Sequence, residues 1–292
     1  MSAAGEARVV GPSATNARDE ARLFIIRPQP WWPRLDVQEI WAFRDLLVSL
    51  TIRDVKLRYR QTFLGIAWVA IQPLMGAAIL GFIFGRVANL TAQGTPHFAL
   101  ALVCVVGWTA FSGSLTRSAP SVVQSEALVS KVFFPRVLLP LSASAASVVD
   151  VTVGMVLAAL VAWRSGVTLS VAALAAPLWV LATVLLALGV GLVAAALMVR
   201  FRDVQHMLPF LVQLALFASP VAYPVTAIPP AYRFAFQLNP LAGLMEGLRW
   251  SLLGLPPASW AAVAYSVLVA LLAFAGGMLF FRALERGFAD AI

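Results

Sequence analysis

The sequence is poor in charged residues and in the side chains that bind metals or form disulfides. Only 12% of its 292 residues are charged, while 61% are hydrophobic. Soluble globular domains carry about 25% charged residues. The single cysteine, Cys104, excludes an intramolecular disulfide. The two histidines, His97 and His206, lie far apart in the sequence, so no spacing typical of a metal site is present. This composition indicates an integral membrane protein without a metal centre.

Motifs for catalysis and nucleotide binding are also missing. The two lysines, Lys56 and Lys131, do not follow the glycine spacing of a phosphate-binding loop. No HExxH, CxxC or GxSxG pattern occurs. A proton-coupled carrier needs ionisable relays within the membrane, and Asp150 is the one clear candidate. We therefore expect no enzyme activity and no cofactor in this chain, and any transport must draw its energy from another subunit.

Long apolar runs predict about six transmembrane helices. A helix needs about 20 predominantly apolar residues to cross the ~30 Å hydrocarbon core. The windows that qualify or come close are Phe63–Gly85, Phe98–Thr116, Val137–Trp163, Leu169–Val199, a proline-interrupted run from about Met207, and Ser259–Phe281. Gly189 and Gly191 favour close helix packing. We predict an all-α protein in which residues 63–292 form one six-span domain.

The distribution of basic residues predicts the orientation. With a cytoplasmic N-terminus, 17 of the 21 Lys and Arg residues fall on inner segments and four on outer ones. Such a bias is the rule for inner-membrane proteins. It predicts a multi-pass protein of the bacterial cytoplasmic membrane with both termini inside, and it explains the net charge of +8 without nucleic acid. Residues 1–25 lack an apolar core and are predicted to be a disordered cytoplasmic tail.

Two further segments are not predicted to cross the membrane. Residues 26–62 are predicted to form an amphipathic segment along the cytoplasmic membrane surface, and membrane anchoring alone is the simplest role for it. Its apolar face consists of Ile40, Phe43, Leu47 and Leu50, and its polar face of Asp45, Ser49, Arg53, Lys56 and Arg60. The prolines of Pro220–Pro257 exclude one continuous helix, which favours a re-entrant helical hairpin on the outer side.

Five motifs follow one another along the chain: Arg53–Gly65 with Trp68 and Gln72-Pro73, Lys131–Arg136 (KVFFPR), Val199–Val204 (VRFRDV), Ser219–Val221 with Tyr223-Pro224, and Asn239–Leu241 with Glu246-Gly247. Together they resemble motifs of the permeases of type 2 ABC transporters, in particular the exporters of O-antigen and related polysaccharides. They occur in order, and the resemblance extends from about Ile26 to the C-terminus.

The resemblance implies a transport function and a set of partners. Such permeases form a homodimer with two copies of a separate ABC ATPase, which binds the ATP and the magnesium, and they export a polyprenyl-linked glycan. The implied substrate is a lipid-linked polysaccharide of the O-antigen, teichoic acid, galactan or capsule type. A drug or small-molecule efflux permease of the same superfamily and a non-transporting scaffold are the alternatives.

The first candidate site precedes the first predicted span. Its four basic residues are Arg53, Lys56, Arg58 and Arg60. At the depth of the lipid head groups, guanidinium groups can bind the diphosphate of a polyprenyl-linked substrate bidentately. The alternative is attraction to anionic lipids, which does not depend on which basic residue supplies the charge.

Two further sets of candidate residues depend more on the resemblance. In the family, a short helix that docks on the ATPase lies where Glu126, Ser130 and Lys131 occur here. An ordinary polar loop is the alternative. Candidates for the passage or its gate are Asp150, Tyr223, Asn239 and Glu246. A carboxylate at membrane depth is costly unless it is paired or hydrated, so Asp150 has either this role or a structural one.

Overall fold

A computed structural model describes residues 37–60, 67–88, 95–167, 170–221, 228–285 and 287–288 of the chain. The chain divides into two compact units, Met1–Trp32 and Pro33–Ile292, and all described residues belong to the second. All regular structure in these residues is helical, as predicted. The predicted tail, residues 1–25, lies outside the described ranges.

Five helical segments are long and apolar enough to cross a membrane, and each coincides with a predicted window. Two segments are single helices, α4 (His97–Ser118) and α13 (Trp260–Glu285). The segment Ala67–Val87 consists of α3 (Ala67–Phe82) and a π-helical turn (Ile83–Val87), and Leu138–Arg164 consists of α7 (Leu138–Ala145) and α8 (Val148–Arg164). The segment Val171–Arg200 consists of a 3-10 turn (Val171–Ala175) and α9 (Ala176–Arg200). The fifth predicted window holds a shorter apolar helix, α10, Asp203–Ala218, of 16 residues.

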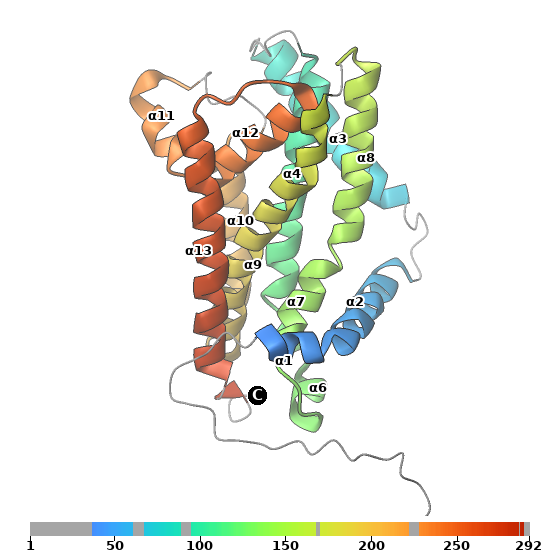
Figure 1. The fold of residues 1–292 in the computed structure, drawn as a ribbon, viewed down its shortest axis with the longest axis vertical. Coiled ribbons are helices and arrows are strands. Elements are labelled where there is room, and N and C mark those ends of the chain that lie inside the picture. Colours follow the sequence, from blue (N-terminus) through green and yellow to red (C-terminus); the bar gives the residue numbers. More distant parts are fainter. Residues whose placement is uncertain are drawn as a thin grey trace, which may run out of the picture. The chain divides into compact units, whose positions relative to one another are not determined.

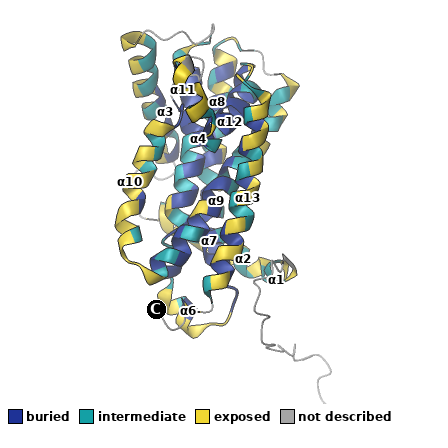
Figure 2. Cartoon of the chain, turned by 90° about the vertical axis from the view of Figure 1, so that its left-hand side faces the viewer, coloured by how far each residue is buried: buried dark blue, intermediate teal, exposed yellow. Residues whose placement is uncertain are grey.

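Helix α4 lies at the centre of the helical bundle. It contacts α3, α7, α8 and α9 (Figure 1). It also contacts α12 (Pro240–Leu253), which lies at one end of the bundle. Its first half is buried throughout from Ala99 to Gly107. The outward faces of α3, α10 and α13 instead expose large apolar side chains, including Phe82, Phe210 and Leu272 (Figure 2). Exposed apolar surface of this extent is expected where a helix faces lipid or another protein chain.

Helices α9 and α13 approach each other closely at two glycines. A Cβ atom built on Gly189 would collide with the backbone of Ala273, and one built on Gly277 would collide with the backbone of Gly189. Gly191 lies against the side chain of Ser118 on α4. The packing role predicted for Gly189 and Gly191 is therefore confirmed, because a Cβ atom at either position would overlap an atom of a neighbouring helix.

The first two helices, α1 (Val37–Ala42) and α2 (Arg44–Tyr59), cross the bundle at the end that also holds the C-terminal end of α13 (Figure 1). The predicted apolar residues Ile40, Phe43, Leu47 and Leu50 pack against the protein core formed by α7, α9 and α13. The predicted polar face is exposed. On the side of α2 opposite Leu50, Val48 and Ile52 are also exposed. The helix thus has one apolar face against protein and a second, narrower apolar stripe that no described residue covers.

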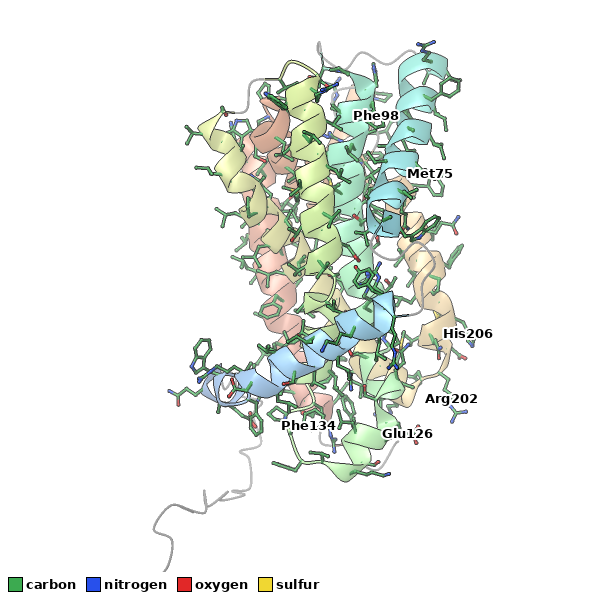
Figure 3. All side chains as sticks on the ribbon, turned by 90° about the vertical axis from the view of Figure 1, so that its right-hand side faces the viewer. Met75, Phe98, Glu126, Phe134, Arg202 and His206 are labelled. Atoms are coloured by element: carbon green, nitrogen blue, oxygen red, sulfur yellow. The ribbon has the colours of Figure 1, made fainter. Side chains whose placement is uncertain are left out.

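Short helices lie at opposite ends of the bundle. Helices α5 (Ser121–Gln124) and α6 (Glu126–Lys131) lie at the end near α1, whereas α11 (Pro230–Gln237) and α12 lie at the other end. Figure 3 shows Glu126 and Arg202 toward the first end and Phe98 toward the second. The prediction that prolines divide residues 220–257 is confirmed, because Pro230 and Pro240 each begin a separate helix.

Candidate functional site

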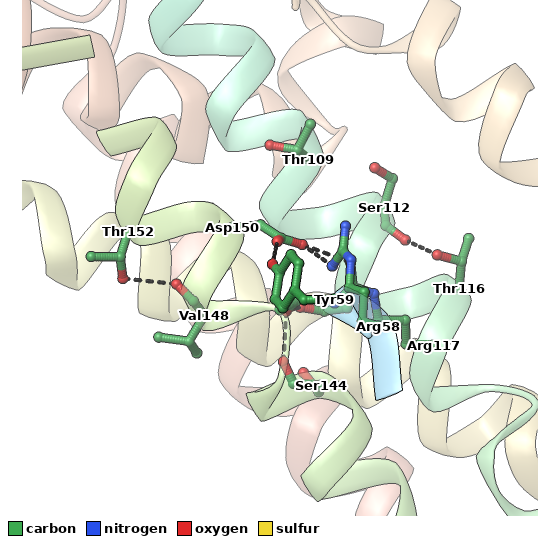
Figure 4. Close-up of polar contacts among 12 residues, drawn as sticks. Arg58, Tyr59, Thr109, Ser112, Thr116, Arg117, Ser144, Val148, Asp150 and Thr152 are labelled. Atoms are coloured by element: carbon green, nitrogen blue, oxygen red, sulfur yellow. Dashed lines mark hydrogen bonds and ion pairs between the residues drawn. The ribbon is translucent and has the colours of Figure 1, made fainter. Parts of the chain in front are cut away.

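Asp150 is the centre of a polar cluster formed by three helices (Figure 4). From α2, Arg58 donates a hydrogen bond to Asp150 Oδ2 and the hydroxyl of Tyr59 donates to Oδ1. From α4, Arg117 Nη2 donates to Oδ2 over 2.7 Å. The Arg58 guanidinium also lies over the Tyr59 ring, 5.6 Å from its centroid. The structure thus joins Arg58 and Asp150, which the sequence had placed in two different candidate sites.

The local sequence explains why these groups meet. Tyr59 is the last residue of α2, Arg117 is the penultimate residue of α4, and Asp150 lies in the first turn of α8. An acidic side chain is favoured in the first turn of a helix by the free backbone N–H groups. Helix α8 begins after a break at Ala146 and Ser147, and this break sets the direction of its first turn relative to α4.

The cluster has more positive than negative charge. Two guanidinium groups face one carboxylate, and the side chains of Arg58, Arg117 and Asp150 are 34%, 26% and 15% exposed. Burial, followed by the hydrogen bond to Asp150, raises the pKa of Tyr59 to about 12. The phenol therefore stays protonated at neutral pH and donates its proton to the carboxylate. The arrangement binds an anionic group through three donors and leaves one positive charge in excess.

The other predicted basic residues of α2 differ in their surroundings. Arg53 binds its neighbour Asp54, with Nη2 2.8 Å from Oδ1. Asp54 Oδ2 also accepts a hydrogen bond of 3.4 Å from Ser142 on α7. Lys56 and Arg60 are exposed, and neither forms an ion pair with any described residue. The four residues therefore do not form one uniform patch: two are paired, and two remain accessible to an external anion.

The start of α1 is held by a second ion pair. Arg282 Nη1 on α13 lies 2.8 Å from Glu39 Oε2, and the Arg282 side chain is only 6% exposed. Arg136, which follows α6, contacts Glu285 three residues further along α13. The segment α1–α2 is therefore attached at both ends, to α13 through Glu39 and to α4 and α8 through the Asp150 cluster.

The predicted ATPase-docking residues lie on an exposed projection. Glu126, Ser130 and Lys131 are all exposed on α6. Phe133, directly after the helix, is 77% exposed, although Phe134 is buried in the core. An exposed phenylalanine beside exposed charges is typical of a protein-binding surface. This geometry is compatible with docking, which stays a prediction.

The remaining passage or gate candidates are held within the segment around α12. Asn239 caps α12 by accepting the Leu241 N–H at 3.0 Å, and its amide donates to the Ala218 carbonyl at the end of α10. Glu246 is buried and accepts the Ala258 N–H at 3.1 Å. Tyr223 lies outside the described residues. A role in a passage stays a prediction for all three.

Sequence reasoning missed several partners in these contacts. In the sequence, Arg117, Arg249 and Arg282 bear only on the predicted orientation, and Tyr59 lies within the Arg53–Gly65 motif. Arg249 is buried, and its guanidinium donates to Cys104 Sγ at 2.9 Å and to the Pro220 carbonyl. An arginine next to an apolar window was the available signal, but its partner is 145 positions away in the sequence. Within the described ranges, no group of His, Cys, Asp or Glu residues could hold a metal ion.

Comparison with known proteins decides the family. Residues 45–253, from the start of α2 to the end of α12, match the family described as ABC-2 type transporter. The chain belongs to the ABC-2 type transporter family. It is therefore a membrane subunit of a transporter and not an enzyme, and the ATPase is a separate chain. The long apolar helices make it a multi-pass membrane protein.

Relatives of this ABC-2 type protein carry names from polysaccharide export. The O-antigen export system permease protein RfbA of Myxococcus xanthus is 30% identical over 211 residues, covering 72% of this chain and 80% of the relative. The protein of the same name from Klebsiella pneumoniae is 28% identical, covering 70% and 78%. The polysialic acid transport protein KpsM of Escherichia coli is 24% identical, covering 68% and 77%.

Proposed function

We propose that this chain is the membrane subunit of an ATP-driven exporter that moves a lipid-linked cell-surface polysaccharide across the bacterial cytoplasmic membrane. The observation that carries the proposal is the similarity to O-antigen export permeases over about seven tenths of the chain. A second polysaccharide transporter, for polysialic acid, is also among the relatives. The absence of a phosphate-binding loop from the sequence fits a subunit that depends on a separate ATPase.

The proposed topology has six crossings with both termini in the cytoplasm. Five crossings are the long apolar segments, and α10 supplies the sixth. At 1.5 Å per residue, α10 is about 24 Å long, so the bilayer is expected to thin locally around this helix. Helices α11 and α12 then form a re-entrant hairpin on the outer side. This orientation agrees with the excess of Lys and Arg on the inner segments.

The proposed assembly is a homodimer with two ABC ATPase subunits bound on the cytoplasmic side. Six helices of one chain cannot enclose a passage wide enough for a polymer, whereas two copies related by a two-fold axis can. The exposed projection with Glu126, Ser130, Lys131 and Phe133 is the proposed ATPase contact. The ATP and magnesium then belong to the ATPase, and this chain holds neither.

Helix α2 is proposed to lie in the cytoplasmic head-group layer. Its exposed stripe, Val48 and Ile52, would face the acyl chains, while the exposed cations Lys56 and Arg60 would face the head groups. A polyprenyl-linked glycan carries its diphosphate at that depth. Arg53, Lys56, Arg58 and Arg60 are therefore the proposed residues that receive the lipid diphosphate, and the sugar chain enters the passage behind it.

Deletion of the gene in the source bacterium tests this function. Cells without the chain should lose a surface polysaccharide and accumulate the same polymer, linked to lipid, inside the cytoplasmic membrane. Expression of the chain in trans should restore the surface polymer. Unchanged surface polysaccharide together with increased sensitivity to small toxic compounds would instead favour a drug efflux permease.

A further inference from the structure

The Asp150 cluster has the composition of an anion-binding site that the protein fills with its own carboxylate. Two guanidinium groups and one phenol, from α2 and α4, all donate to the two oxygens of Asp150 on α8 (Figure 4). Arginine forks and hydroxyl groups are the donors that proteins use for phosphate oxygens. A single arginine would be enough to neutralise the aspartate, so the second leaves a positive charge without a counter-charge in the cluster.

The position of the cluster makes it accessible to a lipid head group. Tyr59 ends α2, the last described helix before the membrane segment that begins at Ala67, and Arg117 lies in the last turn of α4. The side chains of Arg58 and Arg117 are about one third and one quarter exposed, so the site is not sealed. Lys56 and Arg60, which have no ion-pair partner among the described residues, lie on the same end of α2.

We propose that Asp150 is an internal competitor for the substrate's diphosphate, an inference that rests on the proposed function. In the structure described here, the carboxylate occupies the place of the diphosphate between Arg58 and Arg117. When an isoprenoid diphosphate binds the two guanidinium groups, Asp150 is displaced and the C-terminal end of α2 separates from α8. Substrate binding and release of α2 are thus one event, because the same two arginines hold either Asp150 or the diphosphate.

The competition also provides selectivity among the lipids that surround the protein. A phosphodiester head group carries one negative charge, the same as Asp150, and gains little by replacing a carboxylate that is already held by three donors. A diphosphate carries more negative charge and more acceptor oxygens, so it can engage both arginines at once. Abundant anionic lipids are therefore rejected by a bound carboxylate, while the rarer diphosphate lipid replaces it.

Binding of farnesyl diphosphate to the full-length chain tests the proposal. The chain is placed in phosphatidylcholine nanodiscs, and radiolabelled probe is measured by equilibrium dialysis against empty nanodiscs. Asp150→Asn should bind the probe about ten-fold more tightly than wild type, since a competing charge in direct contact with both arginines is lost. Arg117→Gln should bind it more weakly. Farnesyl monophosphate should bind wild type more weakly than the diphosphate does, and it should gain affinity in Asp150→Asn by a similar factor, because the same competitor is removed.

Two further variants keep the test decisive. Tyr59→Phe keeps the ring and removes the hydroxyl that donates to Asp150 Oδ1, so a folded protein with a smaller gain in affinity than that of Asp150→Asn is expected. Asp45→Asn removes an acid of α2 whose side chain is 91% exposed and lies outside the cluster, and it should bind as wild type does.

The possible failures are distinguishable. If wild type binds the diphosphate and neither Asp150→Asn nor Tyr59→Phe binds it more tightly, Asp150 is a structural tether and the proposed function stands. If neither wild type nor Asp150→Asn binds it saturably, the diphosphate site is wrong as well. Loss of surface polysaccharide on gene deletion tests the export function independently of both.

Discussion

Arg136 and Glu285 are joined by two hydrogen bonds that use both the backbone and the side chain of each residue. The backbone N–H of Arg136 donates to Glu285 Oε1 at 2.6 Å, and the Arg136 guanidinium donates to the Glu285 backbone carbonyl at 2.6 Å. Glu285 ends α13, and Arg136 follows the exposed α6. One turn earlier on α13, Arg282 binds Glu39 of α1. The end of α13 therefore fixes both the α6 segment and the first helix.

Replacing Glu285 by alanine should lower the stability of the protein. The partly buried Arg136 N–H would lose its acceptor, and the cost should lie toward the lower end of the ~1–3 kcal/mol that a fully buried donor without a partner costs. Thermal unfolding of the purified chain in detergent should therefore show a clearly lower melting temperature. Glu126→Ala, which removes an exposed carboxylate at the same end of the bundle, is the matched control and should unfold as wild type does. Equal melting temperatures for all three proteins would contradict the structural role of Glu285.

Two neighbouring glycines of α13 should respond very differently to the same substitution. Gly277→Ala places a Cβ against the Gly189 backbone, so α9 and α13 must separate and the yield of folded protein should fall. Gly276→Ala meets no atom within 4 Å and should be tolerated. The measurement is the monodisperse peak in size-exclusion chromatography after membrane extraction. Similar yields for both variants would show that the α9–α13 contact is looser than described.

Thiol labelling tests the proposed topology. The one native cysteine, Cys104, is buried and should not react with an impermeant reagent. Cysteines introduced at Thr91 and Ser165 should react in intact cells, because both positions lie on the proposed outer side. A cysteine at Gln205, exposed at the start of α10, should react only after the cells are opened. Labelling of Gln205→Cys in sealed cells would reverse the orientation.

Charge reversal on α6 tests the proposed ATPase contact. Glu126→Arg should weaken co-purification of the ATPase or separate ATP hydrolysis from export, because an exposed acid at the projection is replaced by a base. Asp203→Arg, an equivalent reversal at the first turn of α10, is the control and should have the smaller effect. Export and ATPase stimulation at wild-type levels in Glu126→Arg would mean that docking occurs elsewhere.

Exchange of arginine for lysine separates diphosphate recognition from simple charge. The double variant Arg58→Lys and Arg60→Lys keeps both charges but loses the planar forks, so polymer export should fall while dimer assembly and membrane insertion persist. Lys56→Arg adds a fork on the same helix end and should not reduce export. Surface polysaccharide is measured on gels of whole-cell extracts. Normal export by the double variant would mean that these basic residues only attract anionic lipids and do not recognise the diphosphate.

The sequence was sufficient to predict the composition-driven features. Runs of about 20 apolar residues predict spanning helices because the bilayer core has a fixed thickness, and five such helices occur at the predicted places. Prolines divide the chain before α11 and α12 because proline cannot continue a helix. Ile40, Phe43, Leu47 and Leu50 are grouped correctly by helical spacing, although the surface that they contact is protein core. Family membership followed from motifs that are local in the sequence.

Only the tertiary structure decided which charged groups meet. Arg58 and Asp150 are 92 positions apart, and Arg282 and Glu39 are 243 apart, so no local period or spacing links them. Four residues near the end of α2 are all basic in the sequence: Arg53, Lys56, Arg58 and Arg60. In the structure, Arg58 is paired with Asp150, whereas Lys56 and Arg60 remain exposed. The spacing of apolar residues along the chain determines which side of a helix is apolar, because residues three or four positions apart lie on the same side of a helix. The partner of a charge depends instead on how helices pack, since an ion pair forms only where tertiary contacts bring the two groups within reach.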